Sequence, residues 1–85
     1  MKFDIQNKKI LITGGADGLG KCLIDELINK NCNITCVDHD KEKLNNLNHK
    51  NIKKILCDLR NLNETEHLLK TIEGEKYDIL INNAG

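Results

Sequence analysis

The 85-residue sequence predicts an α/β fold, in which three helices join the four strands of a parallel sheet with the spatial order 3-2-1-4. Two observations predict it. Short apolar runs rich in β-branched residues alternate with longer segments whose leucines recur at helical spacing. Strands joined by helices in a βαβαβαβ pattern make right-handed crossovers, which produce a parallel sheet. The order 3-2-1-4 follows if the first three strands run outward and the fourth returns beside the first.

The first strand and the first helix have the clearest signals. Residues 10–13 form a short apolar run ended by two glycines, which is typical of a buried strand followed by a tight turn. In residues 19–31 the apolar side chains recur at helical spacing and form one broad stripe: Leu19, Leu23, Ile24, Leu27 and Ile28. Lys30 and Asn31 should end this helix, because a cation suits its last turn and Asn tolerates the left-handed conformation.

The second strand, the second helix and the third strand follow in order. Residues 32–40 predict the second strand. Asp40 is the expected N-cap of a short helix whose apolar stripe consists of Leu44 and Leu47 alone. Residues 51–59 predict the third strand.

The last two elements depend on a cap and a glycine. Asn63 with Glu66 three residues later predicts the N-cap of the third helix, and Gly74 should close that helix. Residues 78–81 predict the fourth strand, which is apolar at consecutive positions, as in a strand covered on both faces.

Composition limits the size and the class of the protein. A chain of 85 residues without proline, repeats or a linker forms at most one small domain, residues 1–85. Thirteen basic and thirteen acidic residues cancel, so net charge gives no argument for nucleic acid or an anionic membrane as partner. No stretch approaches the roughly 18 apolar residues of a membrane span, and the N-terminus lacks a signal peptide's apolar run. We therefore expect a cytoplasmic protein.

The four cysteines do not predict a metal site. They contain no C-x-x-C pair and no finger-like Cys/His spacing. Cys32 and Cys36, if both lie on one extended strand, would be about 13 Å apart, which is too far for a disulfide. We expect small buried thiols in a reducing compartment.

The glycine-rich turn TGGADGLG, residues 13–20, is the first candidate site. It lies between the first strand and the first helix, near the point where the predicted strand order reverses, and ligands of such sheets bind there. Glycines permit positive φ and a close approach of backbone to phosphate, and the helix N-terminus behind them favours an anion. A tight turn with nothing bound is the alternative interpretation of this stretch.

Asp38 makes the turn more specific. It ends the second strand 18 residues after Gly20, where dinucleotide-binding folds place an acid against the adenosine ribose hydroxyls. A solvated acid at a strand end is the alternative. A carboxylate at this position accepts two hydroxyl groups but repels a 2′-phosphate, and Asp17 adds negative charge to the same side. No Arg or Lys lies in the turn or at the strand end, so we expect NAD to bind better than NADP.

These residues resemble the short-chain dehydrogenase/reductase family. Thr13, Gly14, Gly18 and Gly20 fit its T-G-x-x-x-G-x-G turn, residues 82–85 (NNAG) match its second signature, and residues 57–59 (CDL) end the third strand as in many members. The resemblance covers the whole chain and implies a Rossmann-like fold. It also implies that Asp58 binds the adenine amino group, that the backbone of Leu59 contacts the ring, and that residues 82–85 lie along the cofactor ribose. The expected cofactor contacts are Gly14, Asp17, Gly18, Leu19, Gly20, Asp38, Asp58, Leu59, Asn82, Ala84 and Gly85.

Catalytic residues of the family are not found. The resemblance implies a Y-x-x-x-K relay helped by a serine, whereas Tyr77 is followed four residues later by Ile81 and the chain has no serine. The three histidines lie in polar surroundings and are expected at the surface. We therefore expect a truncated, N-terminal NAD-binding part of an oxidoreductase that acts on alcohols or carbonyls and is inactive alone.

Other classes of function stay open at this point. The first is a non-catalytic nucleotide-binding or interaction module, completed by a partner chain that pairs with the exposed edge of the fourth strand. A methyltransferase-type nucleotide site shares the turn and the acid but does not explain residues 82–85. Nucleic-acid binding by residues 49–54 (HKNIKK) has little support, because the run is short and no aromatic residue lies near it.

Overall fold

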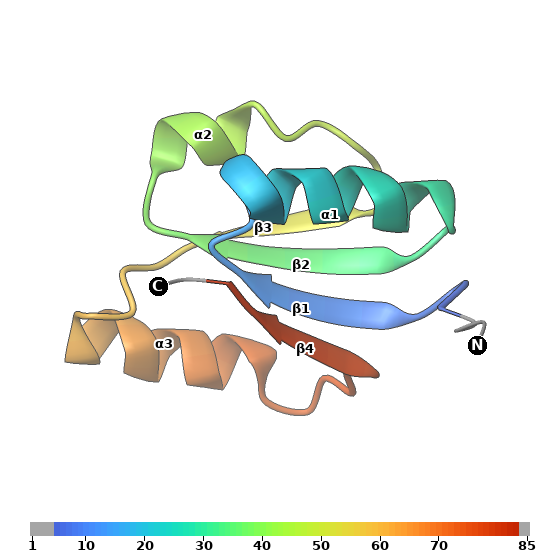
Figure 1. Ribbon diagram of the computed structural model, residues 1–85. Coiled ribbons are helices and arrows are strands. Elements are labelled where there is room, and N and C mark those ends of the chain that lie inside the picture. The colour runs from blue at the N-terminus through green and yellow to red at the C-terminus, as the bar shows by residue number, and fades with distance from the viewer. Residues whose placement is uncertain (1–4, 84–85) are drawn as a thin grey trace.

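The computed structural model describes residues 5–83, and within them the expected α/β fold is confirmed (Figure 1). One parallel sheet has the strand order β3-β2-β1-β4, with β1 and β2 at its centre. The elements follow along the chain as β1 (Lys9–Thr13), α1 (Gly18–Asn29), β2 (Asn33–Asp38), α2 (Lys41–Asn45), β3 (Ile52–Leu56), α3 (Leu62–Ile72) and β4 (Ile79–Asn82).

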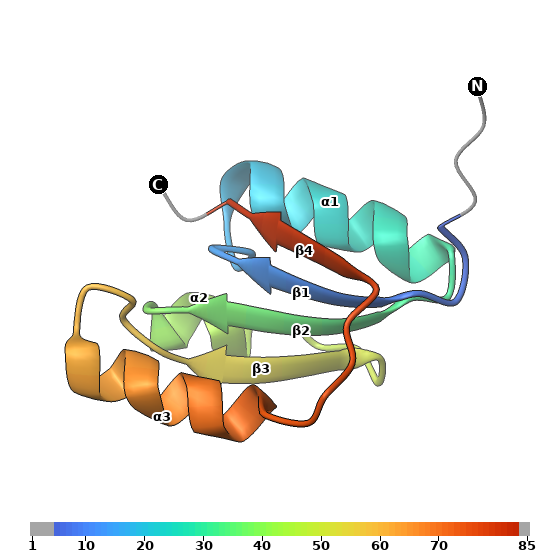
Figure 2. The same cartoon turned by 90° about the horizontal axis from the view of Figure 1, so that it is seen from below.

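The helices cover the two faces of the sheet unequally. α1 and α2 lie on one face, and α3 lies on the other, beside β2 and β3 (Figures 1 and 2). Because side chains alternate along a strand, Ile10 and Ile12 of β1 face α1, whereas Leu11 faces the side of α3. The core under α1 and α2 is the larger one, and Ile10, Ile12 and Ile24 are fully buried in it.

Strand register brings the carboxyl ends of the strands to one edge of the sheet. Thr13 pairs with Val37 of β2 and with Asn82 of β4. Asp38 pairs with Leu56, the last residue of β3. Because all four strands are parallel, the segments that follow these positions begin side by side.

The first helix ends as expected but begins with an exposed leucine. Asn31 adopts the left-handed conformation, with φ of 60°, and its N–H donates to the carbonyl of Ile28 at 2.9 Å. Leu19, expected in the buried stripe, is 69% exposed. It is the second residue of α1, in the first turn of the helix.

The start of the third helix differs from the prediction. The N-cap is Asn61, not Asn63, and its side chain accepts a hydrogen bond from the backbone N–H of Glu64 at 3.1 Å. The spacing Asn-x-x-Glu occurs twice, at 61–64 and at 63–66. The earlier copy is used because the backbone N–H of Asn61 donates to the carbonyl of Asp58, closing a turn directly after β3.

The cysteines are reduced, and three of them match the expectation. Cys32, Cys36 and Cys57 are buried, and desolvation raises the pKa of Cys36 to about 11. Cys22 is exposed on α1, so the expectation of a buried thiol is wrong there. In residues 5–83 no helix is both long enough and apolar enough to cross a bilayer.

The contrast between Ile24 and Leu19 gives a first prediction. Ile24→Ala should lower the free energy of unfolding by about 2–5 kcal/mol, because it leaves a cavity between α1 and the sheet. Leu19→Ala on the same helix should change it by less than about 0.5 kcal/mol. Urea denaturation followed by circular dichroism measures both, and equal losses would contradict the packing described here.

Candidate functional site

A pocket of about 470 Å³ lies at the carboxyl ends of the strands, where the strand order reverses. Its walls come from the glycine turn, the end of β2 with the start of α2, and the segment after β3. The lining residues are Gly14, Asp17, Val37, Asp38, His39, Asp40, Lys43, Cys57, Asp58, Leu59, Arg60 and Asn83.

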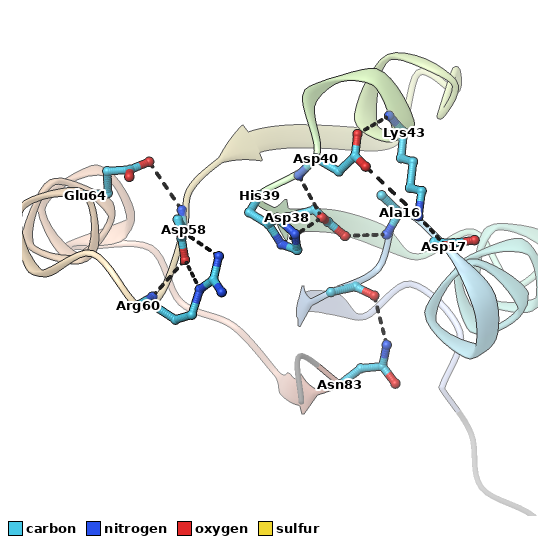
Figure 3. Close-up of polar contacts among 11 residues, drawn as sticks. Ala16, Asp17, Asp38, His39, Asp40, Lys43, Asp58, Arg60, Glu64 and Asn83 are labelled. Atoms are coloured by element: carbon cyan, nitrogen blue, oxygen red, sulfur yellow. Dashed lines mark hydrogen bonds and ion pairs between the residues drawn. The ribbon is translucent and has the colours of Figure 1, made fainter.

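The glycine turn brings three backbone segments unusually close together. Gly14 has a φ of +69°, and its N–H donates to the carbonyl of Val37 at 2.7 Å. Its carbonyl accepts from the side-chain amide of Asn83 at 2.8 Å (Figure 3). A Cβ on Gly20 would lie 2.5 Å from that same carbonyl oxygen. The start of α1 can therefore contact the ends of β1 and β4 only with glycine at position 20.

Asp17 caps the first helix and pairs with the second. One carboxylate oxygen accepts from the N–H of Gly18 at 2.8 Å, and the other from the ammonium of Lys43 at 2.6 Å. Lys43 belongs to α2, so the pair joins the starts of two helices across the mouth of the pocket (Figure 3). The hydrogen bond from Lys43, followed by the one from Gly18, lowers the pKa of Asp17 below its ordinary value of 3.8.

Asp38 lies beside the glycine turn, as expected for an acid that binds ribose. Its residue is 8% exposed, and its two carboxylate oxygens accept from the N–H groups of Ala16 at 3.2 Å and of Asp40 at 3.0 Å (Figure 3). Each carboxylate oxygen has two lone pairs. The carboxylate is thus fixed in position by the turn and retains acceptor capacity toward the pocket.

Asp58 is bound by a neighbouring arginine. The guanidinium of Arg60 donates to both carboxylate oxygens, at 3.0 and 3.1 Å, and the backbone N–H of Arg60 donates at 3.0 Å. The side-chain hydrogen bond from Arg60 is the main cause of the lowered pKa of Asp58. An adenine amino group, the contact that the family resemblance implies, would share this carboxylate with Arg60.

The expected contact residues divide into two groups. Five of them line the pocket: Gly14, Asp17, Asp38, Asp58 and Leu59. Four described residues lie outside it: Gly18, Leu19, Gly20 and Asn82. Asn82 instead accepts from the hydroxyl of Thr13 at 3.0 Å and ties β4 to β1. Ala84 and Gly85 lie outside the described residues.

Lys43 and Arg60 are the lysine and the arginine that line the pocket, and sequence analysis named neither as a site residue. The sequence places no basic residue in the turn or directly at the strand end, but the fold brings Lys43 there from the first turn of α2. The spacing of Asp40 and Lys43 on a helix was the available signal, and their charged groups lie 4.0 Å apart. Nothing in the sequence indicated that Asp17, 26 residues away, would take the same ammonium.

Tyr77 lies away from the pocket. It precedes β4, at the opposite end of that strand from Asn83, and its hydroxyl donates to Thr35 at 3.1 Å. Its ring packs into the smaller core with α3. Among residues 5–83, no group of three or more His, Cys, Asp or Glu side chains is placed to hold a metal ion.

The sheet order, the glycine turn at the first helix and the acid ending the second strand define a Rossmann-like α/β protein of the dinucleotide-binding type. The family model described as short chain dehydrogenase matches residues 8–85, and the chain belongs to this family.

Relatives and solved structures support this assignment. The chain is 29% identical to a 17-beta-hydroxysteroid dehydrogenase type 3 of Danio rerio and 31% identical to a cis-2,3-dihydrobiphenyl-2,3-diol dehydrogenase of Paraburkholderia xenovorans. The matches cover 98% and 95% of this chain but 29% and 31% of those proteins, so the chain spans about a third of the length of these relatives.

Two crystal structures of short chain dehydrogenases show the same fold. That from Francisella tularensis superposes with a TM-score of 0.80 at 29% identity, covering 92% of this chain and 31% of the other. That from Leptospira borgpetersenii, solved with bound NAD+, gives a TM-score of 0.78 at 25% identity, covering 96% and 34%.

The close approach at Gly20 gives a second prediction. Gly20→Ala should lower the free energy of unfolding by about 1–3 kcal/mol, because the neighbours of the new methyl group are backbone atoms and the Asn83 amide. Urea denaturation measures the loss. Cys22→Ala, at an exposed position of the same helix, is the control and should cost less than about 0.5 kcal/mol. A Gly20 variant as stable as this control would contradict the geometry.

The ion pair at the pocket mouth gives a third prediction. In an NMR titration of the side-chain carboxyl carbons, Asp17 should titrate below 3.8, and Lys43→Met should raise its pKa toward that value. Because the folded-state pKa is depressed, the stabilisation from Asp17 is complete above its unfolded pKa and is lost as the pH falls through the folded pKa. Lys21→Met, whose lysine pairs with Asp25 instead, should leave the pKa of Asp17 in place. No response to Lys43→Met would refute the pairing.

Proposed function

We propose that this chain binds the adenosine and pyrophosphate portion of NAD, as the cofactor-binding part of an oxidoreductase that acts on alcohols or carbonyls. The position of Asp38 carries the proposal. A nearly buried carboxylate, oriented by the N–H of Ala16 in the glycine turn, ends β2, the place from which an acid binds the ribose hydroxyls in dinucleotide-binding folds. The relative from Leptospira borgpetersenii, crystallised with NAD+, supports this choice of ligand.

Each part of the adenosine and pyrophosphate portion of the cofactor has a group of residues that suits it. The turn that contains Gly14, together with the N-terminus of α1, suits the pyrophosphate, because a close approach of backbone is possible there. Asp38 would accept the ribose hydroxyls. Leu59 and Asp58, at the end of β3, would contact the adenine. Bound NAD would supply the hydride acceptor, and these residues would position its adenosine half.

We further propose that NAD is preferred over NADP. Asp38 ends β2 and Asp40, two residues later, caps α2, and both line the pocket, so a 2′-phosphate on the ribose would meet two carboxylates. The nearby ammonium of Lys43 is already paired with Asp17. The cytoplasmic location expected from the sequence stays a prediction.

Turnover is not expected from this chain alone. It has no serine and no Tyr-x-x-x-Lys sequence, and Tyr77 lies in the smaller core, away from the pocket. The outer edge of β4 stays a predicted pairing surface for a further strand, from this or another polypeptide. Within residues 5–83, β4 pairs with β1 alone, and Leu80 is 66% exposed on it.

Calorimetric titration of the chain with NAD and with NADP tests the proposal. NAD should bind more tightly than NADP, and Asp38→Asn should weaken NAD binding by about tenfold, because hydrogen bonds to a charged acceptor are lost. Glu66→Gln, at an exposed position of α3, is the control and should bind NAD as the native chain does. Absence of NAD binding to a folded native chain would refute the function, and equal or tighter NADP binding would refute the preference.

A further inference from the structure

Two carboxylates contact one ammonium in the pocket, and a third carboxylate lies next to them. The Nζ of Lys43 lies 2.6 Å from Asp17 and 4.0 Å from the carboxylate of Asp40. Asp38, whose carboxylate accepts from the N–H of Asp40, completes the group (Figure 3). With every group ionised, the four side chains carry a net charge of about −2, because one cation faces three anions.

Two helix caps fix the position of this ammonium. The side chain of Asp40 accepts from the backbone N–H of Lys43 at 3.1 Å and sets the first turn of α2. Asp17 caps α1 through the N–H of Gly18 and takes the ammonium with its other oxygen. Lys43 is thus held against Asp17, although it lines the same pocket as Asp38.

We infer that Lys43 is a specificity-determining residue for the ribose end of the cofactor, and that Asp17 withholds its charge from a 2′-phosphate. This inference rests on the proposed binding of NAD. A lysine ammonium on its flexible stem can bind a phosphate as a point charge. While Asp17 holds it, its charge is used in the ion pair, and a 2′-phosphate meets mainly the carboxylates of Asp38 and Asp40.

Removing the charge of Asp17 should therefore change the choice of cofactor. In Asp17→Asn the net charge of the group falls to about −1, and Lys43 loses its nearest anion. Asn is as good an N-cap as Asp, so the start of α1 is preserved. The ratio of NADP affinity to NAD affinity should then rise by about threefold to tenfold, in line with the energies of exposed ion pairs and with the removal of a repelling charge.

A purely structural role for the ion pair predicts a different result. If the pair only fastened α2 to α1, Asp17→Asn and Lys43→Met would lower the urea midpoint by similar amounts and leave the affinity ratio unchanged. The double variant Asp17→Asn/Lys43→Met shows whether the effect of Asp17→Asn comes from the freed ammonium of Lys43 or from the loss of the Asp17 charge. On our inference, the ratio of NADP affinity to NAD affinity falls back most of the way to the native value in the double variant, because no ammonium remains to bind the 2′-phosphate.

The experiment is calorimetric titration of the 85-residue chain and its variants with NAD and NADP. Asp25→Asn is the matched control, because Asp25 pairs with Lys21 on the same helix, at 3.9 Å and outside this pocket. Its affinity ratio should equal that of the native chain. A raised ratio in Asp17→Asn that falls again in the double variant supports the inference.

Three outcomes overturn the inference, and they differ in what else they overturn. An unchanged ratio in Asp17→Asn, with native NAD binding intact, refutes the role of Lys43 alone. If the ratio is raised in Asp17→Asn and stays raised in the double variant, loss of the Asp17 charge alone explains the change, and the role of Lys43 is refuted. Failure of the native chain to bind NAD removes the proposed function and this inference together.

Discussion

The close packing of the glycine turn against the start of α1 and the end of β4 is the constraint on which the pocket depends. The carbonyl of Gly14 accepts from the Asn83 amide while Gly20 of the helix lies directly against it. This contact fixes where α1 begins and therefore where Asp17 stands as its N-cap. It also brings the segment after β4 to the turn that follows β1. A side chain at position 20 would push these segments apart, so the shape of the site depends on glycine at this position.

The parallel register then gathers groups that are distant in sequence. Asp38 ends β2 and binds the N–H of Ala16, 22 residues earlier, so the turn orients the acid and the acid supports the turn. Carboxylates brought together in this way would repel one another. Within the described residues, Asp17 is paired with Lys43 and Asp58 is paired with Arg60. These two cations therefore offset part of the negative charge that the parallel register gathers at this edge of the sheet.

Sequence analysis predicted the features of the fold that depend on local sequence pattern and on the rules of parallel-sheet topology. Alternation of strand-like and helical segments predicted a parallel sheet, the order 3-2-1-4 followed once the fourth strand was taken to return beside the first, and the spacing from Gly20 to Asp38 placed the acid at the turn. The predicted N-cap of α3 was wrong, because Asn61 and Asn63 have the same spacing to a glutamate. Asn61 is the N-cap, and its N–H closes a turn with the carbonyl of Asp58. The exposure of Leu19 was not foreseen either, because helical periodicity does not show which residues of an apolar stripe the rest of the fold covers.

Lys43 could not be found in the same way, since its partner lies on another helix and no pattern links the two. The pocket that it helps to form is asymmetric. Its lining residues lie after β1, at and after the end of β2, and after β3, and within the described chain Asn83 alone comes from beyond β4. A dinucleotide extends across the point where the strand order reverses, so these residues suit its adenosine half. The chain spans about a third of its relatives, at 29% and 31%. We therefore expect the residues of this pocket to contribute to the choice of cofactor.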